Sequence, residues 1–170
     1  DCTNLGLRAS RTTRDVELTI TTFFRGNAGE RGYQFGYRVH FHNRGGDTVQ
    51  MLSRHWLFYN ATGEAPLEVK GPGARGSTPV LRPGGTWEYE SGTSLKTTTG
   101  SIKGSFTFEV LGVAYGSTAV VGEMFQVPLR RVALSAHAAD VAAAARGDED
   151  SVRVSVACGR GAADGKALLA

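Results

Sequence analysis

The feature that most restricts the fold of this chain is a two-residue alternation of apolar and polar side chains that recurs between residues 15 and 131. In an extended strand, successive side chains point to opposite faces, so this alternation gives one buried face and one exposed face. Val16, Leu18 and Ile20 form such an apolar face in the segment 15–24. In the segment 32–43 the apolar face consists of Tyr33, Phe35, Tyr37, Val39 and Phe41. The centre of the chain is therefore predicted to be a β domain.

Turn-forming residues divide this region into about seven or eight strands, which is typical of an antiparallel sandwich. Further strands are expected over 48–60, 67–70 and 86–91, from Ile102 to Val110, and from Phe125 to Leu129. Turns are expected at 60–63, 83–85 and 112–117, where Gly, Pro, Asn and Ser suit the dihedral angles of turns. We therefore predict an all-β fold, built as an antiparallel β-sandwich.

One domain with an extension at each end is expected from the length of 170 residues, because two domains would each lack a sufficient core. We place a basic N-terminal extension at residues 1–13, the sandwich at 14–133 and an Ala- and Gly-rich C-terminal extension at 134–170. The alanines after residue 133 favour a marginal helix, and the alternating residues Val152, Val154 and Val156 suggest a short added strand. This tail has too little apolar area to order itself, so we expect a partner to hold it.

Composition and charge restrict the class of protein only loosely. The net charge of +3 and the pI of about 9.1 suit nucleic acid or an anionic surface but require neither. Cys2 and Cys158 are expected to be free thiols, with a disulfide as the less favoured alternative. No apolar run approaches the length of about 20 residues that a membrane span requires, so we expect no membrane insertion. The arginines of residues 1–14, with Ser and Thr around them, resemble the downstream part of a mitochondrial transit peptide, and an arbitrary start of the chain explains them equally well.

An ordered series of motifs runs through the centre of the chain. The motifs are LSRHW at Leu52 to Trp56, VKGPGARG at Val69 to Gly76, PVLRPGG at Pro79 to Gly85, YESG at Tyr89 to Gly92, GSIKGSF at Gly100 to Phe106 and FQVPLR at Phe125 to Arg130. In this order they resemble the ApaG (DUF525) family, which also occurs as a domain in some F-box proteins and in a mitochondrial polymerase-interacting protein. The resemblance spans roughly residues 13–133 and is far more specific than one short motif. It implies a fibronectin type III-like or immunoglobulin-like sandwich without established catalytic residues.

Gly71, Gly73 and Gly76 form a GxGxxG string, the pattern with which dinucleotide-binding folds hold a pyrophosphate. The two prolines in the following STPVLRPGG cannot open the helix that such a fold needs. We therefore predict a tight loop between strands. The alternative is an anion site built from Lys70, Gly71, Gly73, Arg75 and Gly76. Arg75 and Ser77 depart from the residues usual in the family, which weakens any transfer of a ligand site to this loop.

Three histidines raise the question of a metal site. His40 and His42 share one strand face, and His55 lies on the next expected strand along the chain. No Asp, Glu or Cys lies in obvious register with them, so we expect no metal and no other cofactor.

The SRHW motif raises the question of catalysis. Ser53 and His55 have the residue types of a nucleophile and a base, but they lie two apart on a strand and lack an orienting acid. We therefore predict that the protein is not an enzyme. Arg54 and Trp56 are expected on one face of the strand, with Trp56 in the core and Arg54 stacked or paired nearby.

Positive charge is concentrated in the two extensions and at their junctions with the sandwich. The residues expected to contact RNA or a protein partner are Arg8, Arg11, Arg14, Arg130, Arg131, Arg146, Arg153 and Arg160. Solubility explains these charges equally well, because the acidic run at 148–150 interrupts them. We predict a non-enzymatic interaction or scaffold module of a larger protein or ribonucleoprotein assembly, with the mitochondrial ribosome as the expected example and the cytoplasm as the alternative location. The alternative function is binding of a small anion or phosphate ligand by the GPGARG loop.

Overall fold

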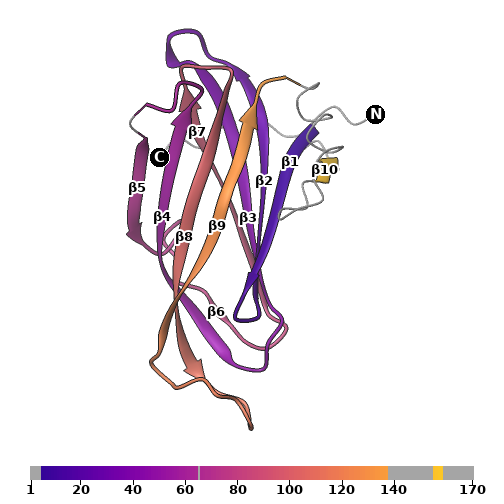
Figure 1. Ribbon diagram of the computed structural model, residues 1–170, viewed down its shortest axis with the longest axis vertical. Helices are drawn as coiled ribbons and strands as arrows, with labels where there is room; N and C mark the ends of the chain where they lie inside the picture. Colours follow the sequence, from indigo (N-terminus) through magenta and orange to yellow (C-terminus); the bar gives the residue numbers. More distant parts are fainter. Residues whose placement is uncertain (1–4, 65, 138–154, 159–170) are drawn as a thin grey trace.

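A computed structural model describes residues 5–64, 66–137 and 155–158 of the chain (Figure 1). The strands are β1 (Leu5–Thr13), β2 (Val16–Asn27), β3 (Tyr33–Asn43), β4 (Thr48–Asn60), β5 (Leu67–Pro72), β6 (Val80–Leu81), β7 (Thr86–Leu95), β8 (Thr99–Gly112), β9 (Met124–Ser135) and β10 (Ser155–Cys158). A short 3-10 helix, η1 (Gly29–Arg31), links β2 to β3. Among these residues, no helix has the length and apolar character needed to span a membrane.

The strands form two antiparallel sheets. The first sheet has the order β10-β1-β2-β3-β7, and the second has the order β5-β4-β8-β9 with β6 also paired to β4. In Figure 1 the long strands of both sheets run close to the long axis of the molecule. Antiparallel sheets packed in this way form a β-sandwich, which confirms the fold predicted from the alternation. The short strand β6 was not expected.

The core lies between the two sheets and is filled by the alternating residues of the sequence. Val16, Leu18 and Ile20 of β2 are fully buried. Trp56 and Phe106 of the second sheet are also fully buried, and their rings meet edge to face with centroids 5.2 Å apart. Burial of one such side chain contributes roughly 1.5–3 kcal/mol. The predicted core position of Trp56 is confirmed.

The first sheet extends further toward the N-terminus than we expected. We assigned residues 1–13 to an extension, but residues 5–13 form β1, which pairs with β2 along its length and buries Leu7 and Ala9. The two turn residues between β1 and β2 are Arg14 and Asp15, with φ angles of 46° and 64°. Two-residue turns of this left-handed kind usually contain Asn-Gly or Asp-Gly. Because that signal is missing here, the sequence did not reveal the hairpin.

The C-terminal boundary also differs from the one predicted at residue 133. Strand β9 continues to Ser135 and buries Leu134, which we had placed in a helix-prone segment. Strand β10 pairs with β1 and sets Val156 opposite Leu7. Val152 and Val154, together with the remainder of the predicted helix, lie outside the described residues. Part of the predicted C-terminal extension therefore belongs to the first sheet.

Candidate functional site

The glycine-rich segment after β5 forms a tight two-residue turn. Ala74 and Ser77 exchange backbone hydrogen bonds of 2.9 and 3.0 Å, and Arg75 and Gly76 between them have φ angles of 50° and 75°. These angles fit a type I′ turn, whose left-handed dihedral angles glycine adopts at little cost. The Gly73 amide donates to a carbonyl oxygen of β4 at 2.7 Å. Three amides of the loop are thus bonded within the chain, which agrees with the predicted tight loop.

The five predicted anion-binding residues do not all line one hollow of the described chain. Lys70 and Gly71 belong to β5 and line a hollow of about 480 Å³ beside Ser53 and His55. Arg75 instead lines a separate hollow of about 300 Å³. Neither hollow is lined by Gly73 or Gly76, whose place is in the turn itself. The residue that lines both hollows is Arg54, which we had not included in the predicted site.

The hollow that contains Arg75 lies between β7, at one edge of the first sheet, and β5, at one edge of the second. We call it the edge cleft. Inward-facing residues of β7 change along the strand from the aromatic Trp87 and Tyr89 to the small Ser91 and Thr93. Small side chains fill less of the space between the sheets than aromatic rings do. The edge cleft therefore opens where the sequence of β7 changes from large to small residues.

Arg54 points toward the inner side of β4, the side that also carries Trp56 and Phe58. Its Nη1 donates to the carbonyl oxygens of Pro72 at 3.1 Å and Gly73 at 2.7 Å. Among the described residues, no carboxylate forms an ion pair with Arg54 or with Arg75. Charged groups at an inner face of a sandwich are uncommon unless they are paired. The edge cleft thus contains two cations and lacks a matching acid within the described part of the chain.

Two tyrosines and several hydroxyl groups complete the edge cleft. Burial raises the pKa of Tyr37, partly offset by a hydrogen bond to Ser91, and burial also raises the pKa of Tyr89. The Tyr89 hydroxyl accepts a hydrogen bond from Trp56 Nε1 at 3.2 Å. Both phenols therefore stay neutral at physiological pH. The buried Thr93 hydroxyl has no hydrogen-bond partner among the described residues. This environment favours an anionic ligand with polar atoms over a cation.

The imagined three-histidine site does not form. His40 and His42 lie on β3 in the first sheet, whereas His55 lies on β4 in the second sheet. His55 Nε2 instead contacts Glu68 Oε1 of β5 at 2.7 Å. The described residues contain no group of three side chains placed to hold a metal ion. Glu68 supplies the acid that we missed beside His55, but within the described part no serine hydroxyl is hydrogen-bonded to His55.

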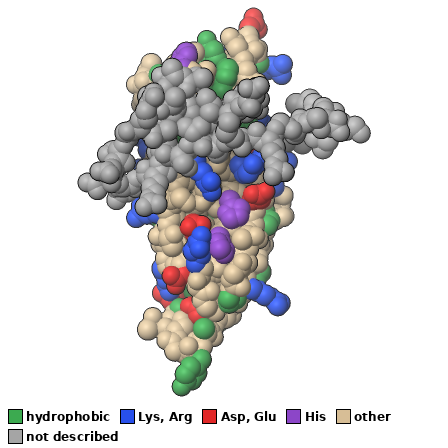
Figure 2. Space-filling model, turned by 90° about the vertical axis from the view of Figure 1, so that its right-hand side faces the viewer, with side chains coloured by type: hydrophobic (Ala, Val, Ile, Leu, Met, Phe, Trp, Pro, Cys, Tyr) green, Lys and Arg blue, Asp and Glu red, His purple; other side chains and the backbone are tan. Residues whose placement is uncertain are grey.

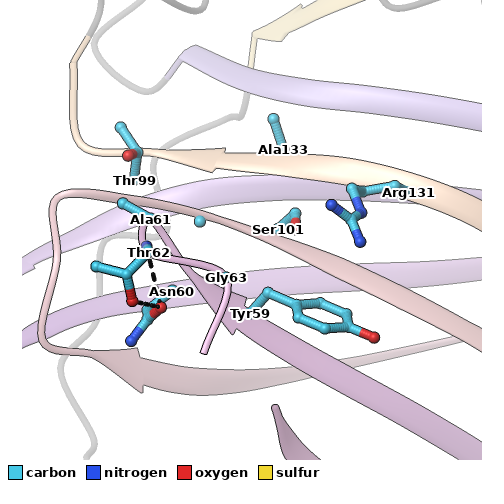
Figure 3. Close-up of a pocket in the computed structure, with 10 residues that line it drawn as sticks. Tyr59, Asn60, Ala61, Thr62, Gly63, Thr99, Ser101, Arg131 and Ala133 are labelled. Atoms are coloured by element: carbon cyan, nitrogen blue, oxygen red, sulfur yellow. Dashed lines mark hydrogen bonds between the residues drawn. The ribbon is translucent and has the colours of Figure 1, made fainter. Parts of the chain in front are cut away.

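A third hollow, of about 580 Å³, lies at the end of the second sheet beside Arg131 (Figure 3). Arg131 of β9 places its guanidinium 4.8 Å from the centre of the Tyr59 ring of β4. Figure 3 shows Asn60, Ala61 and Thr62 at the turn that follows Tyr59. The hollow is shallow and open, and its arginine is already stacked on a ring.

The other arginines predicted to contact RNA or a partner occupy different surroundings. Arg8 and Arg11 lie exposed on β1. Arg14 forms an ion pair with Glu123 at 2.9 Å, so its charge is already matched. Arg130 is a residue of strand β9. Arg146, Arg153 and Arg160 lie outside the described residues. Only Arg14 among the described arginines of this set is shown to be paired with an acid, and RNA contact stays a prediction.

The hairpin between β8 and β9 presents a feature that sequence reasoning missed. It projects beyond one end of the sandwich in Figure 1, and apolar side chains cap that end in Figure 2. We call residues 111–124 the hairpin tip; its exposed apolar residues are Leu111, Val113, Tyr115, Val120, Val121 and Met124. Tyr115 is fully exposed, and Val120 is 66% exposed. We had predicted only a turn over residues 112–117.

Two acidic side chains hold the hairpin tip in place. The Asp47 carboxylate accepts hydrogen bonds from the Ala114 amide at 2.8 Å and from the Ser117 hydroxyl at 2.7 Å, and these bonds lower the pKa of Asp47. Arg14 donates two hydrogen bonds of 2.9 and 3.1 Å to Glu123 and lowers the pKa of that carboxyl. The Arg14 guanidinium also lies 4.7 Å from the centre of the Phe125 ring. The tip is therefore an ordered protrusion.

Comparison with known proteins places the chain in a family. The sequence profile of the ApaG domain matches residues 25–110. The chain belongs to the ApaG family. It is 45% identical to Protein ApaG of Paramagnetospirillum magneticum over 103 residues, which are 59% of this chain and 78% of that ApaG protein. It is 38% identical to Protein ApaG of Rhodospirillum centenum over 121 residues, which are 69% of this chain and 85% of that relative.

A solved structure shows a similar fold. The crystal structure of the ApaA protein from Bordetella pertussis superposes with a TM-score of 0.61 and 29% sequence identity. The match covers 71% of this chain and 93% of the ApaA chain. These results confirm the family resemblance and the sandwich. None of these protein names states an activity or a ligand, so the function of this ApaG-family chain has to be inferred from its surfaces.

Proposed function

We propose that this protein is an interaction module that acts by binding another protein and not by catalysis, with the hairpin tip as its docking element. The observation that carries the proposal is the group of exposed apolar side chains at the tip, including the fully exposed Tyr115. Soluble domains seldom leave such a group in water unless a partner covers it. Aromatic residues and methionine, as at Tyr115 and Met124, are also enriched in protein interfaces.

The hairpin tip is suited to docking because it is held in shape before a partner arrives. Asp47 and Arg14 bond it to the body of the sandwich. A protrusion that is ordered in advance loses little conformational entropy on binding. Glu123, the charged residue within the tip, is already paired with Arg14. We therefore expect the partner to present an apolar, uncharged groove.

One feature supports binding over catalysis. The contact between His55 and Glu68 lies on a partly exposed part of the second sheet, where each side chain is at least 38% exposed. Water at such a position weakens the electrostatic effects on which most catalysis depends.

The relatives named above come from bacteria and give no support to the predicted mitochondrial location or the mitochondrial ribosome. We therefore propose a partner by its chemistry alone.

Replacement of Tyr115 and Val120 by serine in the full chain tests this proposal. Affinity purification from cells of the source organism, with quantitative mass spectrometry, should show loss of at least one protein that the unmodified chain retains. Val80→Ser is the matched control, because Val80 is 49% exposed but lies on β6, outside the tip. A photo-crosslinking amino acid at position 115, but not at position 80, should link to the same protein.

The unmodified chain, the double-serine variant and Val80→Ser should unfold at the same temperature, since exposed side chains contribute little to stability. Retention of the same proteins by the double variant and by Val80→Ser would show that the tip is not the docking element.

A further inference from the structure

We propose that the edge cleft binds an extended acidic segment of a partner protein, which adds as a strand beside β7 and places one carboxylate against Arg54 and Arg75. This site goes beyond the docking role of the hairpin tip and uses a different surface. It draws on three features of the cleft: an open strand edge, unmatched positive charge, and a mixed apolar and hydroxyl lining.

The open strand edge belongs to β7. Within the described residues, β7 is hydrogen-bonded to β3 on one side and to no strand on the other. Edge strands usually carry Lys, Pro or other features that prevent a further strand from pairing. Strand β5, the facing edge of the second sheet, has such features in Lys70 and Pro72. The segment of β7 from Ser91 to Ser94 has neither, so its backbone is open to an added strand.

The charge of the cleft selects an acidic segment. Arg54 and Arg75 both line the cleft, and neither forms an ion pair with a carboxylate of the described chain. Arg54 is fixed by its two hydrogen bonds to the carbonyl oxygens of Pro72 and Gly73, which leave its remaining N–H groups available. A guanidinium that is held in advance binds a carboxylate with less loss of side-chain entropy.

The lining of the cleft suits the side chains of an extended peptide. In an added strand, alternate side chains would point inward, because successive residues face opposite sides of a sheet. On the inner side they would meet apolar groups from Phe58, Leu67 and Val69. Leu67 is 56% exposed and would be covered by such a segment. Thr93 also lines this space, and its buried hydroxyl lacks a partner among the described residues.

These features favour a peptide over a small free anion. A free phosphate would engage the arginines but would leave Leu67 and the open backbone of β7 uncovered. The amides of Gly73, Ala74 and Ser77 are already donated within the chain, so the loop adds few donors for a phosphate. A peptide uses the strand edge, the apolar lining and the charge together.

The test uses the full chain and a defined probe, a capped peptide of about eight residues with alternating threonine and valine and one glutamate in place of a central valine. The control probes are the same peptide with glutamine in place of glutamate, the same peptide N-methylated at alternate amides, inorganic phosphate and glutarate. Binding is measured by fluorescence anisotropy and by amide chemical shifts in NMR spectra.

The glutamate peptide should bind saturably and shift the amides of residues 91–94. It should bind about tenfold more tightly than the glutamine peptide, as expected for charge-assisted hydrogen bonds. Arg75→Asn should remove most of this preference, because asparagine keeps the left-handed turn while the charge is lost. Arg54→Gln should do the same. Arg11→Gln, which removes an exposed arginine of β1, should bind like the unmodified chain.

Several outcomes would overturn the proposal. They are the absence of saturable binding at about 1 mM peptide, equal binding of the glutamate and glutamine peptides, and equal binding of the N-methylated peptide. Complete competition by phosphate or glutarate with the same shifts at residues 91–94 would mean that the cleft is an anion site only. The Tyr115 and Val120 double-serine variant should bind the peptide normally, so failure of the tip as a docking element and failure of the cleft as a peptide site remain distinguishable.

Discussion

The edge cleft and the hairpin tip depart from the usual distribution of residues in opposite directions. In the cleft, a charged side chain, Arg54, occupies an inner face of the sandwich. At the tip, apolar side chains such as Tyr115 and Val120 point into solvent. Both departures are held by short polar contacts from neighbouring segments, through Pro72 and Gly73 in the cleft and through Asp47 at the tip.

The difference between these two regions shows how one stable core supports two kinds of surface. A sequence specifies a fold when its local patterns agree with the global structure, and departures from that agreement gather at functional sites. The cleft offers charge and hydrogen bonds in a recess, whereas the tip offers apolar area on a protrusion. We therefore expect the core to determine stability and the two regions to determine binding.

The largest effect should come from the core that both regions share. Trp56→Ala should lower the free energy of unfolding by about 3–5 kcal/mol, because it leaves a cavity beside Phe106 and removes the hydrogen bond to Tyr89. Urea denaturation followed by circular dichroism measures this change. Tyr115→Ala should change the same quantity by less than about 0.5 kcal/mol. Equal losses for the two variants would place the tip within the cooperative core.

A smaller effect is expected in the cleft. Arg54→Met should lower the free energy of unfolding by about 0.5–1.5 kcal/mol, because the carbonyl oxygens of Pro72 and Gly73 lose their donor at a position that water can partly reach. The same denaturation experiment measures it, with Arg82→Met as the control because Arg82 is exposed. A stabilised Arg54→Met variant would show that the arginine is retained at a cost to folding, which would strengthen its assignment to ligand binding.

The order of the tip should depend on pH. Hydrogen bonds hold the pKa values of Asp47 and Glu123 below their ordinary values of 3.8 and 4.5. A lowered folded pKa contributes stability above the unfolded value and loses it as pH falls through the folded value. Hydrogen exchange at the Ala114 amide should therefore be slow near neutral pH and lose its protection below about pH 4, after correction for intrinsic exchange. Asp47→Ala, which removes the accepting oxygens, should show weak protection throughout; full protection in this variant would contradict the anchoring role.

The smallest effect on stability is expected from the tip surface itself. Tyr115→Ser combined with Val120→Ser should leave the free energy of unfolding unchanged within about 0.5 kcal/mol. It should reduce self-association at high protein concentration, because less apolar area remains exposed. Sedimentation velocity over a concentration series measures this change, with Val80→Ser as the control. Stronger self-association of the double variant would show that the exposed apolar residues do not drive it.

Much of the fold could be predicted because the alternation of side chains is a local property. The alternation predicted the strands around Val16, Tyr37 and Phe106, and the glycine-rich segment predicted the tight turn at Gly76. Strand β1 was not visible, because Arg14 and Asp15 form its turn without the usual glycine. The candidate site was found in part: Arg75 was named from its loop, but Arg54 was treated as a neighbour of the core.

The sequence by itself determined most of the long strands, which side of each of them is buried and where several tight turns fall, because these depend on residues that are close together in the chain. The tertiary structure decided that β7 and β5 lie on the same side of the sandwich as edge strands, that Arg54 and Arg75 line the cleft between them, and that most apolar side chains of the hairpin tip remain in solvent. A run such as Ala119, Val120 and Val121 has the composition of a buried strand. Whether it is buried depends on which other strands pack over it, and those strands are distant in sequence. The polar contacts of Asp47 and Arg14 instead fix the backbone and the charge on either side of this run.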